Sequence, residues 1–348
     1  MAPSKEHITP STASLTGRKF LMRRHPWERI GMTYKKRLFG SASFTFPPPA
    51  YLILNVSSSY SSPTGNHDDG MLFVYPNYRV NAFGFLSGRQ VADSLRCLKQ
   101  VDVQTLREAS LQVTASHKYT TSYYSWVPVI DGTFLPEPLS EAVTKVNNDS
   151  RCRQSNLQFA FAIVEGTGDP PFNASVASFR EWVAGYLPTF SSADRQRLEE
   201  LYPERGSTGS SPGGYNDTYT RAGLVYRDSG LACPAYWITG TAPKGGWLGE
   251  YTIAPAKHAS DVYWWNSVNS AQHTDRMHYE GYAGAMSSFF MTGDPNAMKL
   301  TPEDIPGVPP LKSGLEFVVD GLGFSTAGLT EFRKRCDFWL AMASHVPI

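Results

Sequence analysis

The chain has 348 residues, of which 41% are hydrophobic and 18% charged, so it is long enough to bury a sizeable core. Its formal net charge of +1 gives no reason to expect nucleic acid or an anionic membrane as the main partner. The 29 glycines and 25 prolines favour long loops around a sheet over a helical bundle.

Residues 1–49 are predicted to be a poorly ordered, basic N-terminal segment. The segment is rich in Ser and Thr and ends in the run Phe46–Pro49, whose prolines break regular structure. It contains no apolar stretch of the kind found in a signal peptide. A transit peptide, a solvated tail and a misread start of the coding region all fit this composition.

The middle of the chain alternates between strand-like and helical patterns. Tyr51–Val56 is a short apolar strand, and Met71–Tyr75 is a continuous apolar run typical of a strand buried in a parallel sheet. Apolar residues fall near one face of a predicted helix over 90–115. Further strands are predicted at Tyr123–Ile130 and at Leu157–Val164.

The remainder of the chain is predicted to be mainly helical. Ser191 can cap a helix that runs through Leu201, because Asp194 stands at the third helical position of a capping-box pattern. Further helices are predicted at about 218–241, at about 275–291 and from Leu329 onward. Together with the strands, they predict a layered α/β fold. The longest apolar run, Phe159–Val164, is too short to span a bilayer, so no transmembrane segment is expected.

Four blocks resemble one known family. Asn77–Ser87 (NYRVNAFGFLS), directly after the strand MLFVY, resembles the N-Y-R-x-x-x-F-G-F motif of the type-B carboxylesterase/lipase family. The blocks that agree in the same order are Trp126–Pro138, Cys233–Trp237 and Met286–Asn296. The resemblance is to the fungal-type members, which are serine hydrolases. It implies that residues 50–348 form a shortened carboxylesterase domain, an incomplete α/β-hydrolase fold with a mostly parallel central sheet flanked by helices.

The same resemblance singles out two catalytic candidates. Glu165 ends a predicted strand in Ile163–Thr167, where the family carries the acid of its catalytic triad. His258 lies in Ala254–Trp264, which resembles the family's histidine loop. A histidine held by a carboxylate can take the proton of a serine and return it to the leaving alcohol. Taken alone, a glutamate after a strand or a histidine in a loop is usually a solvated residue.

The serine nucleophile is not found. The family places its G-x-S-x-G turn inside the interval that Gly88–Ser125 fills here, and this interval contains no such motif. Ser57–Gly70 also lacks the adjacent glycines of the family's oxyanion loop. The formal match at Gly209–Gly213 follows the acid, and Pro212 has no backbone N–H to donate to an oxyanion. Ester hydrolysis is therefore expected to be absent or strongly impaired, and the gaps resemble missing segments.

Cysteines and glycines argue against metal and cofactor sites. The four cysteines, Cys97, Cys152, Cys233 and Cys336, include no C-x-x-C pair, and Gly321-Leu322-Gly323 lacks the third glycine of a dinucleotide motif. No metal and no cofactor is expected. The cysteines can form up to two disulfides, whose pairing the spacing leaves open. A bridge between Cys233 and Cys336 is one hypothesis.

Three interpretations of function remain open. The first is a carboxylic-ester hydrolase by descent, with a small-molecule or lipid ester as substrate. The second is a non-catalytic, cholinesterase-like binding protein, and the third is a defective truncated product. The resemblance and the N-x-[ST] sequons at Asn55, Asn148, Asn173 and Asn216 suggest secretion, although no signal peptide is recognised. His273 and His278 lack the context of His258 and are expected at the surface.

Overall fold

The structure is a computed structural model of the whole chain. It describes residues 13–15, 18–20, 51–56, 71–76, 98–116, 129–130, 132, 135–148, 158–166, 176–207, 214–257, 260–265, 275–278, 281–282, 284–297 and 306–346. The chain divides into two compact units, Met1–Asn77 and Tyr78–Ile348, which are described separately.

Two small antiparallel pairs form the described part of the first unit. Strand β1 (Ala13–Leu15) pairs with β2 (Arg18–Phe20), and β3 (Tyr51–Val56) pairs with β4 (Met71–Pro76). Both predicted strands of this region are confirmed, but the parallel environment predicted for β4 is wrong. A continuous apolar run reports burial and not direction, and β4 returns antiparallel along β3.

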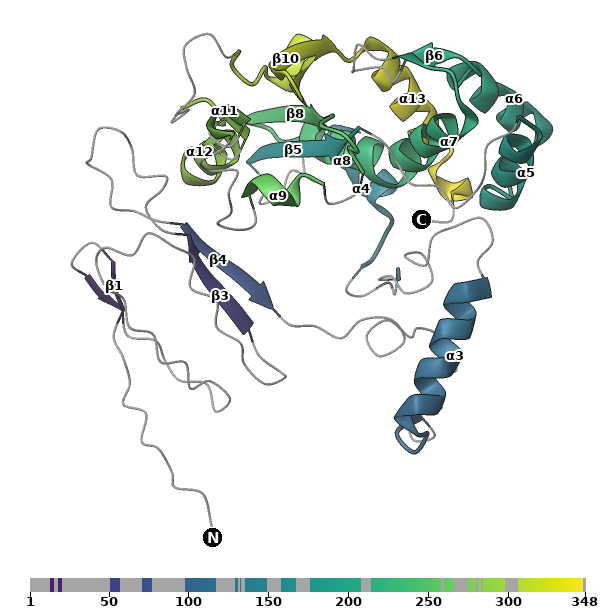
Figure 1. Ribbon diagram of the computed structural model, residues 1–348, viewed down its shortest axis with the longest axis horizontal. Helices are drawn as coiled ribbons and strands as arrows, with labels where there is room; N and C mark the ends of the chain where they lie inside the picture. The colour runs from purple at the N-terminus through teal and green to yellow at the C-terminus, as the bar shows by residue number, and fades with distance from the viewer. Residues whose placement is uncertain are drawn as a thin grey trace. The chain divides into compact units, whose positions relative to one another are not determined.

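A four-stranded sheet is the centre of the second unit (Figure 1). Its strands are β5 (Phe159–Glu165), β8 (Gly245–Tyr251), β9 (Leu315–Asp320) and β10 (Gly323–Gly328), in the order β10-β9-β8-β5. The β5–β8 and β8–β9 pairs are parallel, whereas β9 and β10 form an antiparallel hairpin. The predicted α/β fold with a mostly parallel sheet is confirmed.

Alternating side chains give this sheet two buried faces, as the pleat of a strand requires. Val164 of β5 and Leu248 of β8 pack into one apolar cluster together with helical residues such as Trp182 and Phe332. Side chains of the opposite parity enter a second cluster, which contains Phe161, Trp247, Tyr251, Phe317 and Val319. Helical residues therefore cover both faces of the sheet. Glu250 lies two residues after Leu248 in β8, so its side chain is on the same face as that of Leu248.

The described helices lie mainly in the second half of the chain. The α-helices are α3 (Val103–Ser116), α4 (Leu139–Asn148), α5 (Val176–Tyr186), α6 (Ser192–Leu201), α7 (Thr218–Arg227), α8 (Cys233–Thr241), α9 (Val262–Trp265), α11 (Arg276–His278), α12 (Gly284–Thr292) and α13 (Thr330–Ala341). The 3-10 turns are η5 (Leu311–Ser313) and η6 (Ala343–His345), and β6 (Gly206–Ser207) pairs with β7 (Gly214–Tyr215). Among the residues described, no helix is both long and apolar enough to cross a membrane.

Local signals explain several helix boundaries. Helix α6 has the predicted capping box, since the Ser191 hydroxyl accepts from the Asp194 amide and the Asp194 carboxylate accepts from the Ser191 amide. Within the predicted helix over 90–115, residues 90–97 lie outside the described residues, and α3 begins at Val103, where the Asp102 carboxylate accepts two backbone amides at its first turn. The predicted helix over 218–241 is α7 and α8 joined by a π-helical turn, η3 (Asp228–Ala232).

Gly246 allows β8 to approach α8 closely, and its replacement by alanine tests this packing. A Cβ at this position would lie 2.3 Å from the carbonyl oxygen of Thr239, so the backbone would have to move. We expect G246A to lower the free energy of unfolding by about 1–3 kcal/mol, the usual effect of overpacking. Urea denaturation measures the change. G321A is the control, since a Cβ at Gly321 meets no atom within 4 Å, and an equal loss in both variants would contradict this account.

Candidate functional site

The two catalytic candidates stand at or after the carboxyl ends of neighbouring parallel strands. Glu165 is the last residue of β5, and its backbone lies opposite Tyr251, the last residue of β8. His258 comes after the loop that leaves β8. The carboxyl ends of adjacent parallel strands meet at one edge of a sheet, which is where sites of α/β proteins form. The Glu165 side chain and all of His258 lie outside the described residues, so their pairing stays a prediction.

The turn after Glu165 packs directly on the loop that leads to His258. The Gly166 amide donates to the Tyr251 carbonyl oxygen at 2.8 Å. A side chain at Gly166 would start 3.1 Å from that oxygen and 3.4 Å from the Ala256 Cβ, so glycine permits this close approach. Ala256 is buried and has a φ of 52°, which is uncommon for a residue with a side chain. Such conformations cluster at functional sites.

Aromatic hydroxyls hold the far end of the same loop. The Tyr282 hydroxyl donates to the Asp261 carboxylate at 2.9 Å, and the Trp264 indole N–H donates to the Tyr251 hydroxyl at 2.8 Å. Burial raises the pKa of Tyr251, although the Trp264 hydrogen bond opposes this, and the Asp261 carboxylate raises it further. The described residues before and after His258 are therefore each held by packing or hydrogen bonds.

Arg227 connects the turn after Glu165 to a buried group of charges. Its Nε donates to Oδ1 of Asp228 at 2.8 Å, and its Nη1 donates to Oε1 of Glu250 at 2.6 Å. The same Nη1 also donates to the carbonyl oxygen of Gly166 at 2.9 Å. Arg227 is 1% exposed, and both carboxylates are 0% exposed. One side chain thus joins α7, β8 and the turn that follows β5.

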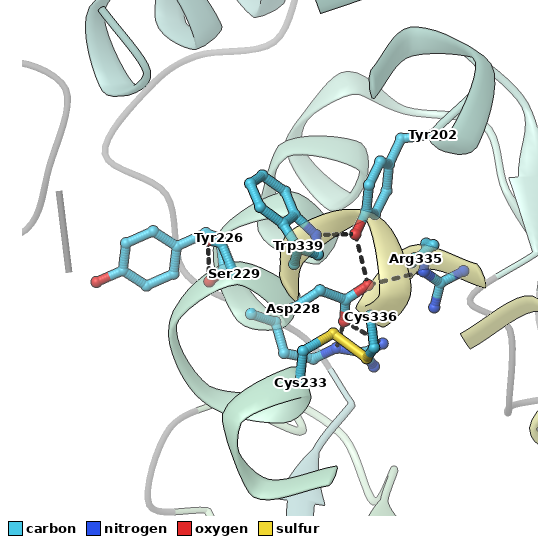
Figure 2. The surroundings of a disulfide bond; sticks show 9 residues. Tyr202, Tyr226, Asp228, Ser229, Cys233, Arg335, Cys336 and Trp339 are labelled. Atoms are coloured by element: carbon cyan, nitrogen blue, oxygen red, sulfur yellow. Dashed lines mark hydrogen bonds and ion pairs between the residues drawn. A yellow bond between two sulfur atoms is a disulfide. The ribbon is translucent and has the colours of Figure 1, made fainter. Parts of the chain in front are cut away.

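A second arginine completes this group. The other oxygen of Asp228 accepts from Arg335 Nε at 2.7 Å and from the Tyr202 hydroxyl at 2.8 Å, and Trp339 donates to Tyr202 (Figure 2). Burial alone would raise the pKa of Asp228, but Arg227 and Arg335 outweigh it and hold that pKa below its usual value. Burial lowers the pKa of Arg227, but the two carboxylates reverse this and raise it.

The hypothesised disulfide between Cys233 and Cys336 is confirmed, with an S–S distance of 2.02 Å. Both cysteines are 0% exposed. The bridge lies beside Asp228 and Arg335 and joins α8 to α13, as Figure 2 shows. Cys97 and Cys152 lie outside the described residues.

His278 is buried, so the expectation of a surface histidine is wrong. Its Nδ1 lies 2.8 Å from the Asp275 carboxylate, and its Nε2 lies 2.6 Å from the carbonyl oxygen of Asp320. With both ring nitrogens occupied, this histidine–carboxylate pair joins α11 to the β9–β10 turn and offers no nitrogen for proton transfer. His273 lies outside the described residues, within which no group of acidic, histidine and cysteine side chains could hold a metal ion.

Only part of the interval expected to carry the nucleophile is described. Of the interval Gly88–Ser125, residues 98–116 are described, and they form α3 with the turn before it. Ser57–Gly70 and Gly209–Gly213 lie outside the described residues.

The buried charges are the part of the site that sequence patterns missed. Arg227 and Asp228 stand inside a predicted helix, where charged residues are normally solvated. One signal in the sequence was available. Glu250 lies two residues after the core residue Leu248 in β8, so both side chains point to the same buried face of the sheet. A carboxylate placed there needs a buried cation.

Comparison with known proteins connects this geometry to esterases. No protein-family model matches the chain. The carboxylesterase patB of Aspergillus clavatus is 27% identical over 180 residues, which are 51% of this chain and 31% of that protein. The carboxylesterase patB of Penicillium expansum is 25% identical over 207 residues, which are 58% and 36%. A secreted lipase of Arthroderma benhamiae is 22% identical over 184 residues, which are 49% and 31%.

The solved structure of Aspergillus niger EstA shares the fold, with a TM-score of 0.55 and 16% identity. The match covers 76% of this chain and 53% of EstA. The sheet and its helices are thus part of an α/β-hydrolase fold. Together with the sequence matches, this makes the chain similar to carboxylesterases and lipases. It spans only about a third of the length of the patB relatives.

Proposed function

We propose that this chain carries the acid and histidine part of a carboxylic-ester hydrolase. Glu165 orients His258, and His258 is the group that would accept the proton of a nucleophile and return it to the leaving alcohol. The supporting observation is that Glu165 ends β5 and His258 comes after the adjacent parallel strand β8, with the Gly166 turn packed on Ala256 of the intervening loop. Small-molecule or lipid esters are the substrates that fit the names of the relatives.

We also propose that turnover is absent or strongly impaired in the sequence as it stands. The G-x-S-x-G motif is missing from the interval in which the family carries it, and so are the adjacent glycines of the oxyanion loop. Removing the nucleophile of a serine hydrolase costs about 10⁶ in kcat. Each missing oxyanion donor costs a further factor of about 10²–10³.

Hydrolysis of a short-chain chromogenic ester tests this proposal. We expect no release of nitrophenol above the buffer rate from p-nitrophenyl butyrate, because a histidine–glutamate pair without its serine forms no acyl-enzyme. The assay compares the parent chain with H258A. The matched control is H345A, since His345 is exposed and lies in the C-terminal turn η6. Fast hydrolysis that H258A abolishes and H345A preserves would contradict the expected inactivity and reveal another nucleophile.

A non-catalytic ester-binding protein is the second candidate. The buried charges around Arg227, both apolar clusters and the disulfide are assembled without any elbow segment, which favours a stable fold over a defective product. A cooperative thermal transition, together with a saturable change in tryptophan fluorescence on adding the ester and no turnover, would support this candidate. A chain without a cooperative transition would instead be the defective product.

A further inference from the structure

The Gly166 carbonyl is held by a side chain far away in sequence. Arg227 Nη1 donates to that oxygen at 2.9 Å and to Glu250 Oε1 at 2.6 Å, while Nε donates to Asp228. Gly166 is also fixed on its other side, since its amide donates to Tyr251. The residue that follows Glu165 is therefore restrained at both its backbone amide and its backbone carbonyl.

We infer that Arg227 is a positioning residue for the proposed acid Glu165, which it acts on through the Gly166 carbonyl. The inference rests on the proposed function only in calling Glu165 the acid. The contact itself is independent of catalysis. Ala256 packs against Gly166 and lies two residues before the candidate histidine, His258. A shift of the Gly166 turn would consequently reach both halves of the proposed acid–histidine pair.

The simpler alternative is that Arg227 only neutralises buried carboxylates, and Arg335 separates the two roles. Arg335 is 4% exposed and donates from Nε to the same Asp228 carboxylate at 2.7 Å. Both arginines bind the Asp228 carboxylate, whereas Arg227 also donates to Glu250 and to the Gly166 carbonyl, so Arg335 is the control for a weakened bond to Asp228. A guanidinium can serve three acceptors at fixed angles, which a lysine ammonium at the same place cannot do.

Amide hydrogen exchange on the full-length chain tests this inference, with R227K as the variant and R335K as its control. We expect R227K to speed exchange at Gly166 relative to β9 by about tenfold or more, the effect of losing one charge-assisted hydrogen bond on a local opening. R335K should change Gly166 and β9 alike. Equal relative exchange at Gly166 in both variants would overturn the inference. If R227K does not fold, E250Q is used in its place, because E250Q removes the negative charge to which Arg227 Nη1 donates. We expect E250Q also to speed amide exchange at Gly166.

A second signal separates the inference from the proposed function. In a chain labelled with ¹⁵N-histidine, the His258 imidazole signals are assigned by their loss in H258A. We expect both E165Q and R227K to shift them and R335K to leave them in place. Faster exchange at Gly166 in R227K with no response of His258 to E165Q would support the anchoring contact and reject Glu165 as the partner of His258. A response to E165Q without any effect of R227K would reject the positioning role alone.

Discussion

Replacing Asp228 with asparagine is expected to lower the free energy of unfolding by about 3–5 kcal/mol, the usual effect of removing one partner from a buried ion pair. Asp228 is 0% exposed and accepts from Arg227 on one oxygen and from Arg335 and Tyr202 on the other. An asparagine of the same shape removes the charge that balances Arg335. It also turns an N–H₂ donor toward groups that are donors themselves.

Urea denaturation followed by circular dichroism measures this loss. D337N is the matched control, since Asp337 is an exposed residue on the same helix as Arg335, and its change should stay within about 0.5 kcal/mol. A D228N chain as stable as D337N would show that the buried charges contribute nothing net. In that case the desolvation penalty of burying the charges would equal their attraction.

The pH dependence of stability has a definite sign at this residue. Burial would raise the pKa of Asp228, but Arg227 and Arg335 outweigh it, so the native pKa lies below that of the unfolded chain. The ionised carboxylate therefore stabilises the native state fully above the unfolded pKa of about 3.9. This stabilisation is lost as the pH falls through the native pKa. Below about pH 4, the urea midpoint of D228N should consequently fall less with decreasing pH than that of the parent chain.

Local sequence signals predicted the parts of the fold that depend on neighbours in the chain. The capping box at Ser191 and Asp194 was predictable because both partners lie in one turn. The interruption of the predicted helix over 90–115 at residues 99–102, before α3, was missed, since apolar periodicity reports a helical face and not its interruptions. Strand direction was missed at β4 for a similar reason: an apolar run does not encode its partner.

The candidate site divides along the same line. Glu165 and His258 came from motif resemblance, and the structure adds that their strands are parallel neighbours. The contact from Arg227 to Gly166 joins residues 61 apart and depends on the parity of β8 and on the turn η3. A one-residue change in strand register would turn Glu250 to the other face of the sheet. Burial of His278 likewise depends on the β9–β10 hairpin, which no local pattern connects to it.

Removing the Cys233–Cys336 bridge is expected to have an effect of similar size. The cysteines are 103 residues apart, and closing a loop of that length reduces the entropy of the unfolded chain by an amount worth about 4.7 kcal/mol in the chain-entropy model. For a unit of this size, the double variant C233A/C336A should melt roughly 10–20 °C lower. Differential scanning calorimetry measures the shift.

The control must separate the bond from the sulfur atoms. In a background that carries C97A and C152A, Cys233 and Cys336 are the only cysteines, so dithiothreitol can break only this bridge. The reduced chain keeps both buried sulfur atoms, and its midpoint should fall close to that of C233A/C336A. If the thermal midpoint fell in C233A/C336A but not on reduction, the effect would be assigned to the lost side-chain volume instead.

The bridge and the buried charges also predict a coupling. Cys233 directly follows η3, which begins at Asp228, and Cys336 directly follows Arg335, so the disulfide and the Asp228–Arg335 ion pair join the same two segments. Sites that share such a connection are seldom additive. Once the bridge is gone, the chain around Asp228 can relax toward solvent. The substitution D228N then lowers the free energy of unfolding by a smaller amount. D228N should therefore destabilise the C233A/C336A chain less than it destabilises the parent, and additive losses would show that the two connections act independently.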